Sequence, residues 1–195
     1  QDSVYKDWSY YGLGTQMTAR PTLDGHGTYY TKPYYSYDND ALLRAVRLLL
    51  KEPSPRAAYF YDVTNLFAQW MGNQFNEVRD AFTTAYERRD LETMRMAETV
   101  CLNLIGEANA LLEMSPEQSL MEWDRQAAQW CRTAEDSSYY ARQAHTILTI
   151  WGGPILNDYA NRMWGGLLMY YFDRWGQFFA EVTNAVKEGR EFDPA

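Results

Sequence analysis

The sequence has few cysteines, no basic run and no long apolar run. Its two cysteines, Cys101 and Cys131, are too few for a disulfide framework and lack C-x-x-C spacing, so buried free thiols are favoured. The net charge of -8 and the pI near 4.8 argue against nucleic acids and other polyanions as partners. The longest apolar stretches, residues 147–151 and 165–172, are shorter than the roughly 20 residues that cross a bilayer. We therefore expect a globular protein without a membrane span.

The usual catalytic motifs are also missing. The chain has only two histidines, and neither belongs to an E-x-x-H or H-E-x-x-H arrangement, which disfavours di-iron bundles and zincins. There is no G-x-S-x-G sequence, no Walker loop and no dinucleotide fingerprint. Most of the 26 Asp and Glu residues lie opposite apolar stripes, as they do on a solvated helix face. The residues alone therefore indicate a helical domain with no metal site and no cofactor.

Residues 1–39 differ in composition from everything after them. They are rich in Tyr, Gly and Thr, hold two of the seven prolines and show no helical period. We interpret them as an extended arm that packs on the rest of the chain, because so long a loop is usually functional or lies against something else. Residues 40–195 form the expected helical domain. The chain begins with Gln1 rather than Met, which is typical of a processed product or of a fragment of a larger multidomain protein.

From residue 40 onward, apolar residues recur at the three-four spacing of amphipathic helices. Short connections make sequential helices antiparallel neighbours. We predict an all-α fold, an antiparallel helical bundle or array of about six to seven helices with an irregular, aromatic-rich N-terminal arm. Asp90 is expected to cap the third helix. The apolar stripe of that helix consists of Met94, Ala97, Cys101, Leu104, Ala108 and Leu111.

Five local features carry further expectations. One of residues 38–40 is expected to cap the first helix, and Gly72 is expected to be a weak point of the second. Residues 115–118 have the spacing of a capping box, with Ser at its first position, Pro at the first helical position and Gln at its end. A sixth helix is expected from residue 157 or 158, and a seventh from about Asp173.

Three blocks of sequence support a family assignment. They read TARPTL at residues 18–23, YFYDVTNLFAQ at 59–69 and HTILTIWGGPILNDYANRMWGGLLMYYFDRWGQFF at 145–179. In order and approximate separation they resemble the C-terminal helical region of the α-N-acetylglucosaminidases of glycoside hydrolase family 89. The similarity covers nearly the whole chain, and the third block is the specific one. The residues that we take as its structural signature are Arg20, Pro21, Trp151, Asp158, Tyr159, Asn161, Arg162 and Trp175.

The resemblance implies an exo-acting, retaining hydrolase that removes terminal α-linked N-acetylglucosamine with two carboxyl groups about 5 Å apart and no metal. In the family both carboxyl groups come from a barrel domain that precedes the helical region, and no pattern in this chain could build a barrel. We therefore expect no catalytic residue here, an inactive isolated chain, and the preceding barrel and a glycan as its partners. Apolar faces that the barrel would cover should be exposed, and self-association through them is a further expectation.

The resemblance also implies that this region helps to wall the substrate pocket. The candidate contact is the loop PYYSYDND at residues 33–40, because aromatic faces pack on sugar C–H groups and hydroxyls and carboxylates bond sugar hydroxyls. We take Tyr35, Tyr37 and Asp38 as the pocket-wall residues. Family members often have Trp-Tyr-Asn where this chain has Ser36-Tyr37-Asp38, so a platform indole is missing unless Tyr35 replaces it. The alternative is that these tyrosines fix the arm to the bundle.

The stretch from residue 158 to 175 is interpreted as packing rather than as a sugar-binding wall. Asp158 and Arg162 would fix the start of its helix by pairing four residues apart. The core residues expected in this stretch are Met163, Trp164, Leu167 and Tyr171.

Two classes of function are compatible with the sequence. The first is a non-catalytic helical domain of a retaining α-N-acetylglucosaminidase, and the second is a stand-alone helical interaction or scaffold domain. A barrel-coding segment upstream in the same reading frame would support the first. The missing N-x-S/T sequons and the acidic balance favour a bacterial protein that is secreted or periplasmic, with a lysosomal protein as the alternative.

Overall fold

The structure is a computed structural model that describes residues 15–24, 37–149 and 163–193. The regular elements in these ranges are helices, and an isolated bridge joins Ser119 to Gly165. The predicted all-α class is therefore confirmed. The α-helices are α1 (Asn39–Leu49), α2 (Ala57–Glu87), α3 (Leu91–Glu113), α4 (Leu120–Ala128), α5 (Ala134–Thr149) and α7 (Leu168–Lys187), and the short 3-10 helices are η1 (Gln16–Thr18) and η2 (Pro116–Gln118).

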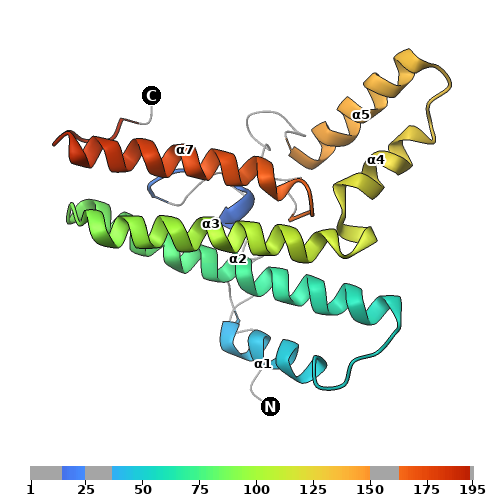
Figure 1. Cartoon of the computed structure of the whole chain (residues 1–195), viewed down its shortest axis with the longest axis horizontal. Helices are drawn as coiled ribbons and strands as arrows, with labels where there is room; N and C mark the ends of the chain where they lie inside the picture. The colour runs from blue at the N-terminus through green and yellow to red at the C-terminus, as the bar shows by residue number, and fades with distance from the viewer. Residues whose placement is uncertain (1–14, 25–36, 150–162, 194–195) are drawn as a thin grey trace.

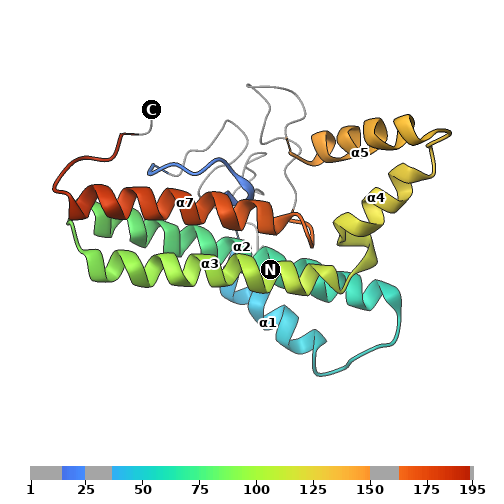
Figure 2. The same ribbon diagram turned by 45° about the horizontal axis from the view of Figure 1, so that its top comes forward.

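Three long helices, α2, α3 and α7, lie side by side and form the main body of the molecule (Figures 1 and 2). A short turn joins α2 to α3, and α7 begins beside the end of α3, so both neighbours of α3 run antiparallel to it. Helix α1 packs on α2 outside this body, while α4 and α5 project from one end as a helical hairpin (Figure 1). Within the described ranges, none of these helices is long and apolar enough to cross a bilayer.

The core between α2, α3 and α7 is rich in aromatic rings. Trp175 packs edge-on against Phe75 with ring centroids 5.0 Å apart, and Phe179 packs against Phe82 at 4.6 Å. Both pairs join α2 to α7, and all four rings are fully buried. Large aromatic rings contribute much buried area and prefer such tilted or edge-on contacts, so these two pairs hold α7 against α2.

The predicted apolar stripe of α3 faces this core. Four of its members, Met94, Ala97, Cys101 and Ala108, are buried. Leu104 and Leu111 are only partly buried, and their neighbours Ile105 and Leu112 are fully buried instead. Because α3 packs against two helices, it buries more than one row of side chains. Both cysteines are free, but only Cys101 is buried, since Cys131 is half-exposed.

The aromatic stretch before α7 packs as predicted in its described part. Leu167 and Tyr171 are buried, and Met163 and Trp164 pack against the core from its edge. The predicted helix start at about Asp173 is wrong, because α7 begins at Leu168. Gly166 has a φ of +86°, a left-handed conformation that lets the chain turn into the helix without the steric cost of a side chain.

Of two predicted helix starts, one is confirmed and the other is wrong. Asp90 caps α3 as expected, since its carboxylate accepts a hydrogen bond from the Thr93 amide at 3.1 Å. The predicted capping box at residues 115–118 is wrong: these residues form η2, and Ser115 makes no side-chain cap bond. The Gln118 side chain contacts α2 instead, where it accepts a hydrogen bond from the Thr64 hydroxyl at 2.8 Å. A side-chain contact with another helix has therefore replaced the contact that was expected within residues 115–118.

Gly165 lies where two backbones meet. Its amide donates to the Gln118 carbonyl at 2.8 Å, and its carbonyl accepts from the Leu120 amide at 2.9 Å. A Cβ atom at residue 165 would lie 2.4 Å from the backbone nitrogen of Glu113 and 2.7 Å from its Cα. Because backbone atoms cannot move aside as the end of a side chain can, only glycine fits here.

We predict that Gly165→Ala lowers the free energy of unfolding by about 2 kcal/mol or more, since overpacking against backbone forces helices α3 and α7 apart. Gly106→Ala is the matched control. Gly106 lies inside α3, and a methyl group added to it would meet no atom of another segment within 4 Å, so its replacement should raise stability by up to about 1 kcal/mol. Urea denaturation measures both, and equal midpoints for the two variants would contradict the packing argument.

Candidate functional site

The predicted pocket-wall residues Tyr37 and Asp38 lie directly before α1, while Tyr35 lies outside the described residues. One Asp38 carboxylate oxygen accepts hydrogen bonds from the amides of Asp40 and Ala41, at 2.9 and 3.2 Å. Its other oxygen pairs with the Arg44 guanidinium at 3.1 Å. The Ala41 amide, with Arg44 and Asp40, lowers the pKa of the Asp38 carboxyl. Asp38 is thus the helix cap, one of the three that the sequence allowed, and a partly exposed anion.

Tyr37 is tied to α2 through its hydroxyl. The Asn73 side-chain amide donates to that hydroxyl at 2.7 Å and to the Asn39 side-chain oxygen at 2.8 Å. Gln69 in turn donates to the Asn73 oxygen at 3.0 Å. Asn73 is buried, so its bonds form where water does not compete. These hydrogen bonds fix the position of Tyr37 and of the first turn of α1 along α2.

Asn73 belongs to a row of polar side chains that follows one face of α2. The residues of this row recur every three or four positions, the spacing that puts side chains on one helix face. We use the name polar stripe for its members Gln69, Asn73, Asn76, Arg79 and Thr83. Three of them, Asn73, Asn76 and Arg79, are buried, although helix α2 also carries the apolar face described above.

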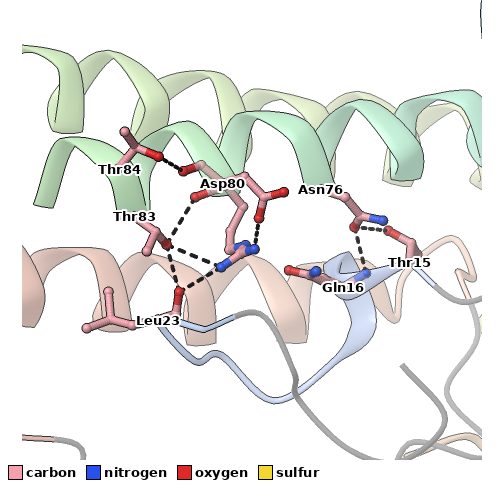
Figure 3. A network of polar contacts seen from close by, with 8 residues as sticks. Thr15, Gln16, Leu23, Asn76, Asp80, Thr83 and Thr84 are labelled. Carbon is pink, nitrogen blue, oxygen red and sulfur yellow. Dashed lines mark hydrogen bonds and ion pairs between the residues drawn. The ribbon is translucent and has the colours of Figure 1, made fainter. Parts of the chain in front are cut away.

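The polar stripe holds residues 15–24, which we term the clamped segment, at both ends (Figure 3). At one end the Gln16 amide donates to the Asn76 side-chain oxygen at 2.9 Å, and the Thr15 hydroxyl donates to the Gly72 carbonyl at 2.8 Å. At the other end the Leu23 carbonyl accepts from Arg79 at 2.8 Å and from the Thr83 hydroxyl at 2.7 Å. These contacts supply hydrogen-bond partners that the single 3-10 turn of the segment does not provide.

Helix α7 holds the middle of the clamped segment. The indole nitrogen of Trp175 donates to the Met17 carbonyl at 3.1 Å, and both side chains are buried. Trp175, a predicted signature residue, therefore has a structural role in both the core and the attachment of the segment. Of the other signature residues, Arg20 is exposed and Pro21 half-buried in the turn between the two clamped ends. Trp151, Asp158, Tyr159, Asn161 and Arg162 lie outside the described residues, as does the predicted start of the sixth helix.

Gly72 explains how the segment approaches α2 so closely. Helix α2 continues through this residue without a break. A Cβ atom here would lie 2.9 Å from the Thr15 side chain. The glycine is needed for contact with another segment, which a single-helix pattern cannot reveal.

Arg79 is the buried charge of this region. Its guanidinium bonds the Leu23 carbonyl and Thr83 and pairs with the exposed carboxylate of Asp80. Burial lowers the pKa of Arg79, but a guanidinium stays protonated at any physiological pH. Burial also raises the pKa of the Cys101 thiol to about 12, so Cys101 is no nucleophile at neutral pH. The arrangement holds backbone in place, and no group of three or more metal-binding side chains occurs among the described residues.

Sequence reasoning singled out Tyr37, Asp38 and Trp175 but missed the polar stripe. The structure brings Tyr37 together with Asn73, while Asp38 beside it caps α1. Asn, Arg and Thr side chains on a helix usually face solvent, so their burial was not expected. The signal that could have revealed the polar stripe is the three-four spacing of these residues beside the apolar face of α2.

Comparisons with known proteins extend this description. The family model described as the alpha-N-acetylglucosaminidase (NAGLU) C-terminal domain matches residues 1–195. A search of curated proteins found no match. Among solved structures, a family 89 glycoside hydrolase of Clostridium perfringens in complex with GlcNAc-alpha-1,4-galactose is 21% identical, with a TM-score of 0.85 over 94% of this chain and 22% of that chain. A complex of a family 89 enzyme from the same organism with PUGNAc gives 21% identity and a TM-score of 0.85 over 95% and 23%. The chain thus spans less than a quarter of these proteins and shares their fold.

We predict that Tyr37→Phe destabilises the chain by about 1 kcal/mol, because the buried Asn73 amide loses one of its two acceptors. Urea denaturation followed by circular dichroism measures the loss. Tyr139→Phe serves as the control, since Tyr139 is exposed on α5. If both variants unfold at the urea concentration of the unmodified chain, the bond to Asn73 does not hold the site.

Proposed function

We propose a function from one premise: the chain belongs to the alpha-N-acetylglucosaminidase (NAGLU) C-terminal domain family, whose model spans residues 1–195. The chain is the helical domain of an exo-acting, retaining α-N-acetylglucosaminidase that removes terminal α-linked N-acetylglucosamine from glycans. It carries no catalytic carboxyl group of its own. Its role is to support the preceding catalytic domain and to help form the wall of the substrate pocket.

Two observations support the proposal that the catalytic groups lie in the preceding domain and that this chain has a supporting role. The chain spans less than a quarter of the solved family 89 enzymes, so most of such a protein lies outside it. In the described residues, the buried side chains of Asn73, Asn76 and Arg79 hold the Tyr37 hydroxyl, the Gln16 amide and the Leu23 carbonyl rather than forming a reactive pair. Retaining glycosidases need two carboxyl groups about 5 Å apart, and the preceding domain is where we place them.

The residues proposed for the wall of the pocket are Tyr37 and Asp38, directly before α1, together with Tyr35, which lies outside the described residues. The bond from Asn73 fixes the ring of Tyr37, and the α1 amides and Arg44 fix the carboxylate of Asp38. A fixed aromatic ring can pack on sugar C–H groups, and a fixed anion can accept hydrogen bonds from sugar hydroxyls, without losing conformational entropy on binding. The same bond to Asn73 also serves packing, so only kinetics separate the two roles.

The location of the protein is part of the proposal. The solved relatives come from Clostridium perfringens, and the chain has no N-x-S/T sequon, which together favour a bacterial protein that is secreted or periplasmic. A lysosomal enzyme is the alternative. A stand-alone scaffold domain is disfavoured, because the whole chain matches one domain of a hydrolase family.

The test of this function compares the parent protein with the isolated chain. The parent should release the aryl group from an aryl α-N-acetylglucosaminide, and residues 1–195 alone should release none, since the catalytic carboxyl groups are outside the chain. In the parent, Tyr37→Ala should lower kcat/KM about tenfold, the effect of losing about 1.4 kcal/mol of transition-state binding. Tyr139→Ala, at an exposed tyrosine of α5, should leave kcat/KM unchanged.

The outcomes separate the two parts of the proposal. A parent that leaves the substrate intact, or an isolated chain that hydrolyses it, contradicts the assigned activity. An active parent whose Tyr37→Ala variant keeps its kcat/KM but melts at a lower temperature shows that Tyr37 only packs.

A further inference from the structure

The chain after α7 turns back onto the body of three helices. Helix α7 ends at Lys187, and Gly189, with a φ of +72°, reverses the direction of the chain over the end of the helix (Figure 2). We use the name strap for residues 190–193, which have no regular structure. The strap lies where α2 and α7 both end, because both helices run antiparallel to α3.

One carboxylate joins the strap to the end of α2. An oxygen of Glu191 accepts a hydrogen bond from the Tyr86 hydroxyl at 2.8 Å, and the other oxygen pairs with the Arg89 guanidinium. The Tyr86 hydroxyl also accepts a hydrogen bond from the Phe192 amide at 3.0 Å. The Tyr86 hydroxyl and the Arg89 guanidinium lower the pKa of the Glu191 carboxyl, so Glu191 is an anion at neutral pH. The strap is therefore held by charge.

Arg89 has a backbone conformation that is unfavourable for arginine. Its φ is +55°, and in the described ranges the other residues with a positive φ are glycines. At the equivalent position after α7 stands Gly189, which adopts this conformation without a steric penalty. In the described ranges, the hydrogen bonds and the ion pair of the Arg89 side chain are all with the strap, at Glu191 and at the Arg190 carbonyl. The strap thus accounts for an arginine where glycine would fit better.

The strap makes little apolar contact with the body. Phe192 packs edge-on against Phe178 of α7 with ring centroids 5.4 Å apart, and it is partly buried. The other strap residues are exposed, and 77% of the Glu191 side chain is open to solvent. Segments with few buried contacts open at a much lower free energy than the whole fold, and salt weakens an exposed ion pair. Local opening of the strap follows from both properties.

We propose that the strap is a conformational switch that opens and closes as a unit over the ends of α2 and α7, while the body of three helices stays folded. In the closed state, Glu191 holds Tyr86 and Arg89, and the ring of Phe192 covers Phe178. In the open state, the edge of the core at Tyr86 and Phe178 becomes accessible. Ionic strength sets the balance between the two states, because charge holds the closed one. This switch is independent of the proposed function.

The Phe192 amide reports opening, because its hydrogen bond to the Tyr86 hydroxyl breaks when the strap lifts. Its exchange with water is measured by NMR spectroscopy on the full chain of 195 residues. Glu191→Gln removes the charge but keeps the shape of the side chain, and it should raise the exchange rate about threefold. Raising sodium chloride from about 0.01 M to about 1 M shortens the Debye length from about 30 Å to about 3 Å. This change should accelerate exchange in the unmodified chain but not in the Glu191→Gln variant.

Arg89→Gly separates the strap from the stability of the turn between α2 and α3. Glycine removes the contacts with the strap and also removes the backbone penalty at a φ of +55°. Exchange of the Phe192 amide should therefore rise about threefold, while the urea midpoint of the chain stays the same or increases. An arginine that only stabilised the turn would give the reverse, a lower midpoint with unchanged exchange.

Two control variants change the same chemistry elsewhere. Arg125→Gln removes a charge from the exposed ion pair between Glu122 and Arg125 of α4. Arg88→Gly replaces the arginine directly before Arg89, whose φ is −88°. Neither variant should change the exchange rate of the Phe192 amide, although Arg88→Gly should lower the urea midpoint, because glycine gains nothing at a negative φ.

Three results would overturn the proposal. The first is unchanged exchange of the Phe192 amide in both Glu191→Gln and Arg89→Gly. The second is acceleration by salt that persists in Glu191→Gln, since charge at that residue would then not hold the strap. The third is exchange of the Phe192 amide only as slowly as the amide of the buried residue Cys101, which would mean that the strap opens only when the whole chain unfolds.

Discussion

The hydrogen bond from the Trp175 indole to the Met17 carbonyl joins the first described segment of the chain to its last helix. Both side chains lie in the core, so the short 3-10 helix η1 near the N-terminus completes the packing of a helix 158 residues later. A buried carbonyl without a partner would be costly, and the indole both fills space and supplies that partner. The body of three helices therefore depends on residues that show no regular pattern of their own.

Helix α2 likewise holds both the clamped segment and Tyr37, which lies directly before α1. One face supplies Phe75 and Phe82 to the aromatic core, while its polar stripe supplies Asn76 and Arg79 to the clamped segment. The next turn of the stripe, at Asn73, holds Tyr37. A change at the polar stripe therefore affects the edge where we place the substrate pocket, even though none of its residues would touch a sugar.

The sequence predicted features that come from a pattern within one helix. It missed features that depend on contact with a distant segment of the chain. The α3 stripe and the Asp90 cap follow from residues within or next to one helix, and the structure has the cap and buries four of the six stripe residues. Gly165 and Gly72 are glycines because other segments pass within 3 Å of where a side chain would begin, which no local pattern records. Gln118 likewise looked like part of a capping box but bonds Thr64 on another helix. The pocket-wall residues came from family resemblance, and only their anchoring contacts come from the structure.

The central claim, that the polar stripe of α2 fixes the clamped segment, can be tested by hydrogen exchange. Asn76→Ala removes the acceptor for the Gln16 amide without disturbing the apolar face of α2. Mass spectrometry of peptides covering residues 15–24 should then show faster exchange, by about tenfold for a bond that contributes about 1.4 kcal/mol, while peptides of α3 keep their protection. Unchanged exchange in residues 15–24 would contradict the account.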